Sequence, residues 1–246
     1  MHKQLPALAL MLALTGCATS DWEQGVGQVL GAIQQPAGQS SALGEGEIIG
    51  GLREALAQGT TKAINQLGRR DGYWNNAQVR IPLPASMARF ESGLRQIGQG
   101  KVVDEFHLTL NRAAEQAVPQ VADIFGNAVR QMSIQDARAI LSGSPDAATQ
   151  FFRRTTSESI YAKVYPIVQT TTQRVGVTQQ YKQLATSYGP LLKMAGVKNL
   201  DLDSYVTEQA LTGLFTTIAE EEARIRQNPA ARTSELLKRV FGSQGR

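Results

Sequence analysis

Apolar residues recur three or four positions apart along most of the stretch from residue 48 to residue 241. This spacing places apolar side chains on one side of an α-helix, whereas a half-buried strand needs them at every second position. Gly68, Gly98 and Gly143 stand where individual helices are expected to end. The sequence therefore predicts an all-α, irregular multi-helix domain of about nine or ten helices.

Several of these expected helices carry signals at their ends or inside them. Ser133 followed by Asp136 is typical of a capping box, and Asp203 is expected to cap the helix that follows it. Proline lacks a backbone N–H, so we expect Pro166 to kink or divide one long helix. For the same reason we expect Gly189-Pro190 to break the next helix along the chain.

One short segment departs from the helical spacing. Val79, Ile81 and Leu83 alternate with Arg80 and with two prolines, directly after a turn at residues 70–73. Alternation favours an extended backbone, but a proline cannot donate to a central ladder of hydrogen bonds. We expect one short extended segment here and no central strand.

The first residues have the pattern of a targeting segment. Lys3 precedes an apolar run from Leu5 to Leu14, which is much shorter than the roughly 20 residues that cross a bilayer. The run ends in small residues before Cys17, the only cysteine of the chain. The alternative is a plain signal peptide with a cysteine at its end by coincidence.

Leu14-Thr15-Gly16-Cys17 resembles the lipobox of bacterial lipoproteins. The resemblance implies cleavage before Cys17, acyl chains on that cysteine, and a membrane as the partner of those chains. Ala18 in the next position implies sorting to the outer membrane, with the protein facing the periplasm. Two or more acyl chains anchor a protein stably, whereas one holds it only marginally.

The composition changes along the chain and suggests four parts. We expect a signal peptide at residues 1–16 and a lipidated N-terminus with a flexible tether at 17–46, which includes a weak helix at 21–34. The helical domain is expected at 47–242, followed by a disordered tail at 243–246.

The charge pattern argues against a nucleic-acid partner. The formal net charge is only +4, and the arginines are scattered rather than gathered in a dense run. A nucleic-acid surface usually needs such a run, often with interleaved aromatic residues. We expect solvated helix faces instead.

No set of residues in the sequence forms a convincing catalytic or metal site. His107 is the only histidine left after cleavage, and no G-x-S-x-G pattern occurs. Asp104 and His107 lie three residues apart on one helix face, but a two-metal site in a bundle needs a second such motif. We assign no catalytic residue, no metal ligand and no cofactor.

Two groups of residues stay open. Asp104, Asn111, Arg112 and Glu115 are spaced so that several share one helix face, which suits either a ligand contact or a buried polar network. Tyr73, Trp74 and Arg80 form the second group, which suits either an interface or packing of loop aromatics onto the core.

Five segments, taken in order, resemble the bacterial family known as domain of unknown function 4197. The likeness covers about residues 43–242 and rests on these stretches: DGYWNNAQVRIPLP, NRAAEQAVPQVADIF, ILSGSPDAATQFFRRTT, DLDSYVTEQALTGLF and EEEARIRQNPAARTSELLKRVFG. The resemblance implies one helical domain exported on a signal or lipoprotein peptide. It implies no established activity and no catalytic residue.

Three hypotheses about function follow. The first is a non-enzymatic envelope lipoprotein whose helical domain binds a periplasmic partner protein or an apolar or cell-wall ligand. The second is a hydrolase or lyase of envelope polymers that uses carboxylates such as Asp104 and Glu115, and it requires one of them buried beside another with a raised pKa. The third is a structural oligomer.

Overall fold

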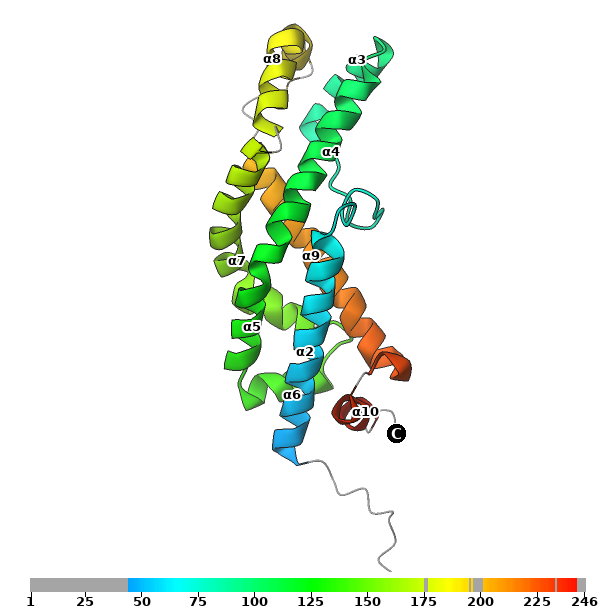
Figure 1. Cartoon of the computed structure of the whole chain (residues 1–246), viewed down its shortest axis with the longest axis vertical. Coiled ribbons are helices and arrows are strands. Elements are labelled where there is room, and N and C mark those ends of the chain that lie inside the picture. The colour runs from blue at the N-terminus through cyan, green and yellow to red at the C-terminus, as the bar shows by residue number, and fades with distance from the viewer. Residues whose placement is uncertain (1–43, 175–176, 195, 197–200, 233, 243–246) are drawn as a thin grey trace, which may run out of the picture. The chain divides into compact units, whose positions relative to one another are not determined.

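The structure, a computed structural model, describes residues 44–174, 177–194, 196, 201–232 and 234–242 (Figure 1). Within these ranges all regular secondary structure is helical, which confirms the all-α prediction. Cys17, the predicted signal peptide, the weak helix at 21–34 and the tail at 243–246 lie outside the described residues. The helices are α2 (Glu45–Gly68), α3 (Ala88–Gln96), α4 (Gly100–Ala117), α5 (Ala122–Gln131), α6 (Ile134–Ser142), α7 (Ala147–Arg174), α8 (Val177–Met194), α9 (Leu202–Gln227) and α10 (Glu235–Gly242), with short 3-10 turns η1 (Ala85–Met87), η2 (Val118–Val121) and η3 (Pro229–Ala231).

The core lies where α7 and α9 pack along each other, with α2, α4 and α5 against them. Phe125 of α5 meets Phe152 of α7 and Phe215 of α9 edge to face, with ring centroids 5.2 and 6.1 Å apart. Aromatic rings prefer this geometry over a face-to-face stack. All three rings are buried, so helices distant in sequence share one aromatic centre.

Helix α6 begins at the capping residue that the sequence predicts, whereas α9 does not. The Ser133 hydroxyl accepts the Asp136 N–H at 3.1 Å, and the Asp136 carboxylate accepts the Ser133 N–H, which confirms the capping box. For α9 the prediction of Asp203 as the cap is wrong, because Asp201 accepts the Ser204 N–H at 2.9 Å. Asp203 lies inside the first turn and accepts a hydrogen bond from the Thr172 hydroxyl of α7.

The two prolines inside helices have different effects. Helix α7 continues through Pro166 as one element, so that proline does not divide it. Helix α8 is interrupted at Tyr188, where φ is −127° and ψ is 24°, immediately before Gly189-Pro190 as predicted. Residues 80–84, where the extended segment was expected, form neither helix nor strand.

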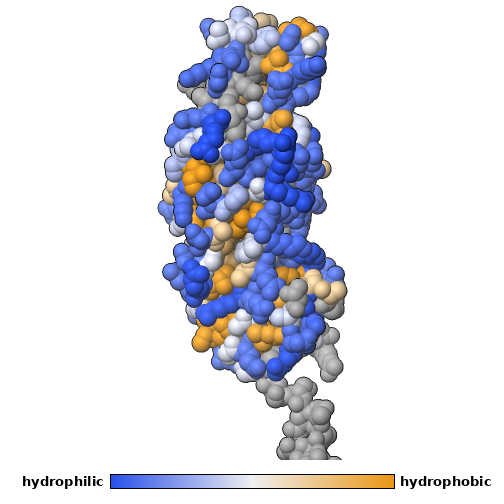
Figure 2. All heavy atoms as spheres, viewed as in Figure 1, coloured by the Kyte–Doolittle hydropathy of each residue, from blue (hydrophilic) through white to orange (hydrophobic). Residues whose placement is uncertain are grey.

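The surface is largely polar. Figure 2 shows hydrophilic side chains over most of the face in view, with apolar residues in separate patches. Of the described residues, the large apolar side chains that are strongly exposed are Ile97, Ile134 and Met194, which belong to different parts of the chain. None of the helices that the structure describes has the length and apolarity that crossing a bilayer requires.

Candidate functional site

The connection from α2 to η1, residues 69–84, is the longest irregular stretch in the described part of the chain. Figure 1 shows it as the teal trace that leaves the end of α2. Connections longer than about 12–15 residues without helix or strand are uncommon in compact domains and are usually either functional or flexible linkers. We call residues 69–84 the clamped loop, because buried side chains of α4 hold its backbone.

The clamped loop begins with a tight reversal against the last turn of α2. Asp71 has a φ of 67°, which is uncommon for any residue but glycine. Gly72 lies so close to α2 that a Cβ there would stand 2.3 Å from the carbonyl oxygen of Leu67. Only glycine fits that approach, so the sequence Asp71-Gly72 fixes where the chain turns back.

Glu115 of α4 holds the next part of the loop from within the domain. Its side chain is 4% exposed, and one carboxylate oxygen accepts the N–H groups of Tyr73 and Trp74, both at 3.1 Å. The other oxygen accepts a hydrogen bond from Arg112 Nη1 at 2.6 Å. Arg112 Nη2 also donates a hydrogen bond to the Asp71 carboxylate at 2.7 Å. A buried carboxylate costs several kcal/mol unless such partners compensate it.

Asn111, one turn earlier on α4, holds the far end of the loop. Its amide oxygen accepts the N–H of Ile81 at 2.8 Å, and its amide nitrogen donates to the carbonyl of Ile81 at 3.0 Å. His107 Nε2 donates to the same carbonyl at 2.5 Å, which assigns the proton to Nε2. Burial lowers the pKa of His107, so the neutral imidazole is favoured.

The side chain of Tyr73 lies in the core and attaches the loop to α9. Its ring is fully buried, and its hydroxyl donates to the carbonyl of Ala210 on α9 at 2.7 Å. Gly213, one turn further along α9, leaves room for the ring, because a Cβ there would lie 2.7 Å from Tyr73 Cε1. Burial, and to a lesser extent the charge of Glu115, raises the pKa of the Tyr73 hydroxyl far above its usual range, so it stays a donor.

The outer side of the loop presents an aromatic and cationic pair to solvent. The Arg80 guanidinium lies 3.7 Å from the ring centroid of Trp74, and the His107 ring meets Trp74 edge-on at 5.2 Å. Trp74 is half-buried and Arg80 is exposed. Tryptophan and arginine are the residues most enriched where protein partners bind tightly.

The structure brings together three of the four residues predicted to share a face of α4. Asn111, Arg112 and Glu115 form the network under the loop. Asp104 lies apart, with its side chain 58% exposed and paired with Arg95 at 2.7 Å. The carboxylates of Asp104 and Glu115 therefore do not form the buried pair that a carboxylate-based hydrolase would need.

The second predicted group is divided between core and surface. Tyr73 is buried, whereas Trp74 and Arg80 remain accessible. Asp71 and Gly213 were missed by the sequence reasoning. The Asp71-Gly72 turn was visible in the sequence, but nothing in the sequence linked it to Arg112 or placed Gly213 beneath Tyr73.

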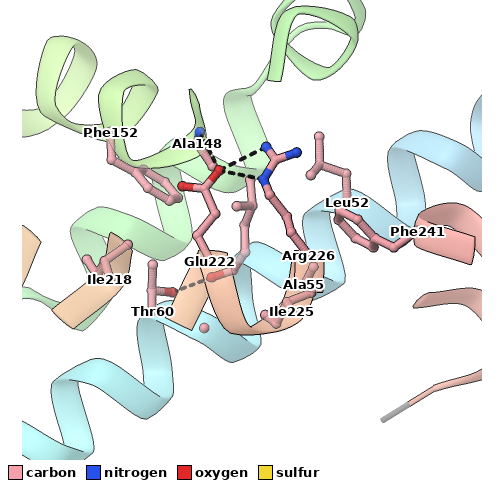
Figure 3. Close-up of a pocket in the computed structure, with 12 residues that line it drawn as sticks. Leu52, Ala55, Thr60, Ala148, Phe152, Ile218, Glu222, Ile225, Arg226 and Phe241 are labelled. Carbon is pink, nitrogen blue, oxygen red and sulfur yellow. Dashed lines mark hydrogen bonds and ion pairs between the residues drawn. The ribbon is translucent and has the colours of Figure 1, made fainter. Parts of the chain in front are cut away.

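A second place with the character of a pocket lies between α2, α7, α9 and α10 (Figure 3). Its apolar lining includes Phe152 and Phe241, and Figure 3 shows the Glu222 carboxylate turned toward the first turn of α7, where it accepts the Ala148 N–H at 2.9 Å. Arg226 pairs with Glu222 at 2.9 Å. The free volume that admits a water-sized sphere is about 20 Å³, little more than one water molecule needs.

Helix α10 closes that pocket by packing on two consecutive glycines of α2. A Cβ on Gly51 would lie 2.8 Å from Val240 Cγ2, whereas one on Gly50 would make only ordinary contact. The close approach buries Leu237, Val240 and Phe241 of α10. The pocket is therefore a small packing gap with a satisfied ion pair rather than a ligand chamber.

Metal ligands do not gather anywhere in the ranges that the structure describes: no group of three or more His, Cys, Asp or Glu side chains is arranged to hold an ion. The clamped loop, with its buried network and its exposed Trp74 and Arg80, is the best-built candidate site.

Comparison with known proteins gives one match. No curated protein and no solved structure matches the chain. Residues 42–242 match the family model described as "Protein of unknown function (DUF4197)", a range that includes the clamped loop and every described helix. The match extends over most of the chain and agrees with the resemblance of its five ordered segments, and the chain therefore belongs to the DUF4197 family.

Proposed function

We propose that this chain is a lipid-anchored protein of the bacterial envelope whose helical domain binds a partner protein through the clamped loop. The anchor is Cys17, which is expected to carry acyl chains that hold the protein at the periplasmic face of the outer membrane. The support for the anchor is the agreement of charge, apolar length and small residues before that cysteine.

The observation that carries the binding function is that a buried charged network holds a solvent-exposed loop. A connection between two helices needs only a few residues and no internal carboxylate. Here Glu115 and Asn111 fix the loop backbone near its two ends, and Arg112 joins Glu115 to the Asp71 side chain. The stacked pair of Trp74 and Arg80 stays accessible to solvent. Preorganised surface side chains lose little freedom on binding, which favours affinity.

The structure gives less support to an internal ligand or to a carboxylate-based reaction. The gap beneath α10 is close to the size of one water molecule, so a ligand at that place would have to displace α10. A carboxylate-based reaction would need Asp104 and Glu115 together, and Asp104 pairs with Arg95 instead. Partner binding at the surface is the use that these contacts favour.

Crosslinking in living cells tests the binding surface. A photoreactive amino acid replaces Asn75 or Gln78, both exposed on the clamped loop, in the native lipidated protein. Matched control positions are Glu158 and Lys163, which are exposed on α7. We expect one discrete protein adduct from the loop positions, which weakens when Glu115→Gln loosens the loop.

Adducts of equal strength from loop and control positions, or from α7 alone, would contradict the binding surface. The anchor is tested separately by Cys17→Ser followed by cell fractionation, in which the variant is expected to leave the membrane fraction. If the variant stays membrane-bound and resists release by salt, acyl chains on Cys17 are not the anchor.

A further inference from the structure

The first half of the clamped loop and the last turn of α2 form an open cleft with excess positive charge. It has a volume of about 520 Å³ and is lined by Arg69 and Arg70, by the amides of Gln66, Asn75 and Asn76, and by Asp71. The cleft is open to solvent, so side chains of a partner can enter it without a change in the fold.

The two arginines of the cleft lack an acidic partner. Both are exposed, and none of the carboxylates that the structure describes forms an ion pair with either. Asp71, the acidic residue of the lining, is paired with Arg112 at 2.7 Å. Arg112 also pairs with Glu115, so one cation from α4 is shared by two carboxylates. With Arg69 and Arg70 added, three cations stand against two carboxylates, which leaves an excess of one positive charge.

The backbone that carries these arginines is fixed on both sides. Arg69 directly follows α2, and its carbonyl accepts the Gly72 N–H at 3.0 Å. Across the cleft, Asn75 and Asn76 follow Tyr73 and Trp74, whose N–H groups Glu115 holds. The two sides of the cleft, residues 69–70 and 75–76, are therefore held at a fixed distance from each other. A flexible surface loop would not keep this distance.

We infer that this cleft binds carboxylate groups of an acidic polypeptide segment, with Arg69 and Arg70 as the residues that hold them. Guanidinium groups bind carboxylates through paired, charge-assisted hydrogen bonds. The neighbouring amide side chains both donate and accept, which suits the peptide groups of a bound chain. This inference rests on the proposed function, because it names the class of partner for the same loop.

An anionic membrane surface fits the cleft less well. Lipid headgroups are recognised by clusters of about 4–8 Lys and Arg residues, since each contributes only about 1 kcal/mol. The cleft supplies two, and the amides between them add no charge. An acidic polypeptide segment that enters the cleft uses both guanidinium groups and the amides together.

The two arginines also lie next to the negative end of the α2 dipole. A helix C-terminus carries roughly half a negative elementary charge. The two positive charges of Arg69 and Arg70 are therefore more than is required to balance it. If stabilising the helix end were their whole role, removing them would change the unfolding midpoint and leave binding unaffected. Binding and stability must therefore be measured on the same variants.

The test uses the full-length native protein in detergent micelles and a fluorescent peptide of alternating glutamate and alanine. The matched probe is the same peptide with glutamine in place of glutamate. We expect the acidic peptide to bind in a salt-sensitive manner, and Arg69→Gln/Arg70→Gln to weaken it by at least about tenfold. The control variant is Arg153→Gln/Arg154→Gln, an adjacent exposed pair on α7 with the same change of charge, and it should leave binding unchanged.

Three outcomes would overturn the inference. The glutamine peptide binds as well as the glutamate peptide, or the two double variants weaken binding equally, or the native protein binds inorganic phosphate or phosphatidylglycerol vesicles but not the acidic peptide. Loop crosslinks in cells that survive Arg69→Gln/Arg70→Gln would reject the acidic partner and leave the proposed function standing.

Discussion

Glu115 is the most deeply buried carboxylate in the described part of the chain. A carboxylate is rarely buried, yet this one lies inside the domain with two backbone N–H groups and Arg112 as partners. Because the partners come from the loop and from its own helix, the charge links the loop to α4. Removing this charge should therefore weaken the attachment of the loop to α4 and also lower the stability of the domain.

Glu115→Gln tests this attachment. The substitution keeps the shape but removes the buried charge that binds two backbone N–H groups and Arg112, which keeps only the more exposed Asp71 as a partner. Loss of such a buried charged partner costs about 3 kcal/mol, at the lower end of the range for broken buried pairs. For a domain of this size the midpoint of thermal unfolding should fall by roughly 6–12 °C. Glu105→Gln, an exposed position on the same helix, should change the unfolding free energy by less than about 0.5 kcal/mol. Equal effects of the two substitutions would show that Glu115 is not a structural charge.

His107 makes stability depend on pH. Its pKa in the folded state is lowered, chiefly by burial, with the positive charge of Arg80 adding to the effect and Glu91 and Asp104 opposing it. At high pH the imidazole is neutral in both states. As the pH falls through about 6.5, the unfolded chain takes up the proton first, so the unfolding free energy decreases until the folded pKa is passed.

The measurement is the urea midpoint of the native protein and of His107→Gln between pH 7.5 and pH 5. Glutamine keeps a donor for the Ile81 carbonyl but does not titrate. We expect the midpoint of the native protein to fall more steeply toward pH 5 than that of the variant. Parallel curves would mean that His107 has the same pKa in both states.

At the scale of elements, the loop depends on a glycine of a distant helix. Gly213 of α9 faces Tyr73, and a methyl group there would overlap the ring at 2.7 Å. Tyr73 cannot retreat without losing its hydrogen bond to the Ala210 carbonyl, which belongs to the same helix. Helix α9 thus sets the depth at which the loop docks.

Gly213→Ala should therefore destabilise the protein although alanine favours helix. The helix gains about 1 kcal/mol, while overpacking costs about 1–3 kcal/mol, so we expect a net loss of up to about 2 kcal/mol in denaturant unfolding. Gly46→Ala, in the first turn of α2 with nothing near its Cβ position, should instead be neutral or stabilising. A stabilising Gly213→Ala would show that the ring and the helix are not in close contact.

Sequence reasoning predicted the elements much better than the contacts between them. The spacing of apolar residues gave the helices, and Ser133 with Asp136 gave one of their ends, because these signals are local. The partner of Asn111 could not be found in this way, since Ile81 lies on a loop and both of its backbone groups are bound. Periodicity shows that Asn111 shares a face with Glu115, but not which segment covers that face.

The same limit applies to the aromatic group on the loop. Tyr73 and Trp74 are adjacent and similar in type, yet one is buried and the other is partly exposed. The difference comes from Gly213, which makes room for one ring from far along the chain. Such a contact leaves no local pattern in the sequence. The sequence could therefore indicate that Tyr73 and Trp74 form an aromatic pair, but not which of the two is buried.

For the whole molecule, the helical domain and the clamped loop should behave as one cooperative unit. The loop is attached to α4 by Glu115 and Asn111 and to α9 by Tyr73, and both helices contribute to the core. A loop held in this way should open only when the domain opens. In a flexible loop the exposed residues would instead move independently of the core.

Native-state hydrogen exchange of the amides of Tyr73, Trp74 and Ile81 tests this claim most directly. These three N–H groups are bound by Glu115 and Asn111 and by no backbone carbonyl of a regular helix. We predict protection close to that of the α4 core amides, with Glu115→Gln accelerating Tyr73 and Trp74 more than α4. Exchange of these three amides at the rate of an unprotected chain, while α4 stays protected, would contradict the account.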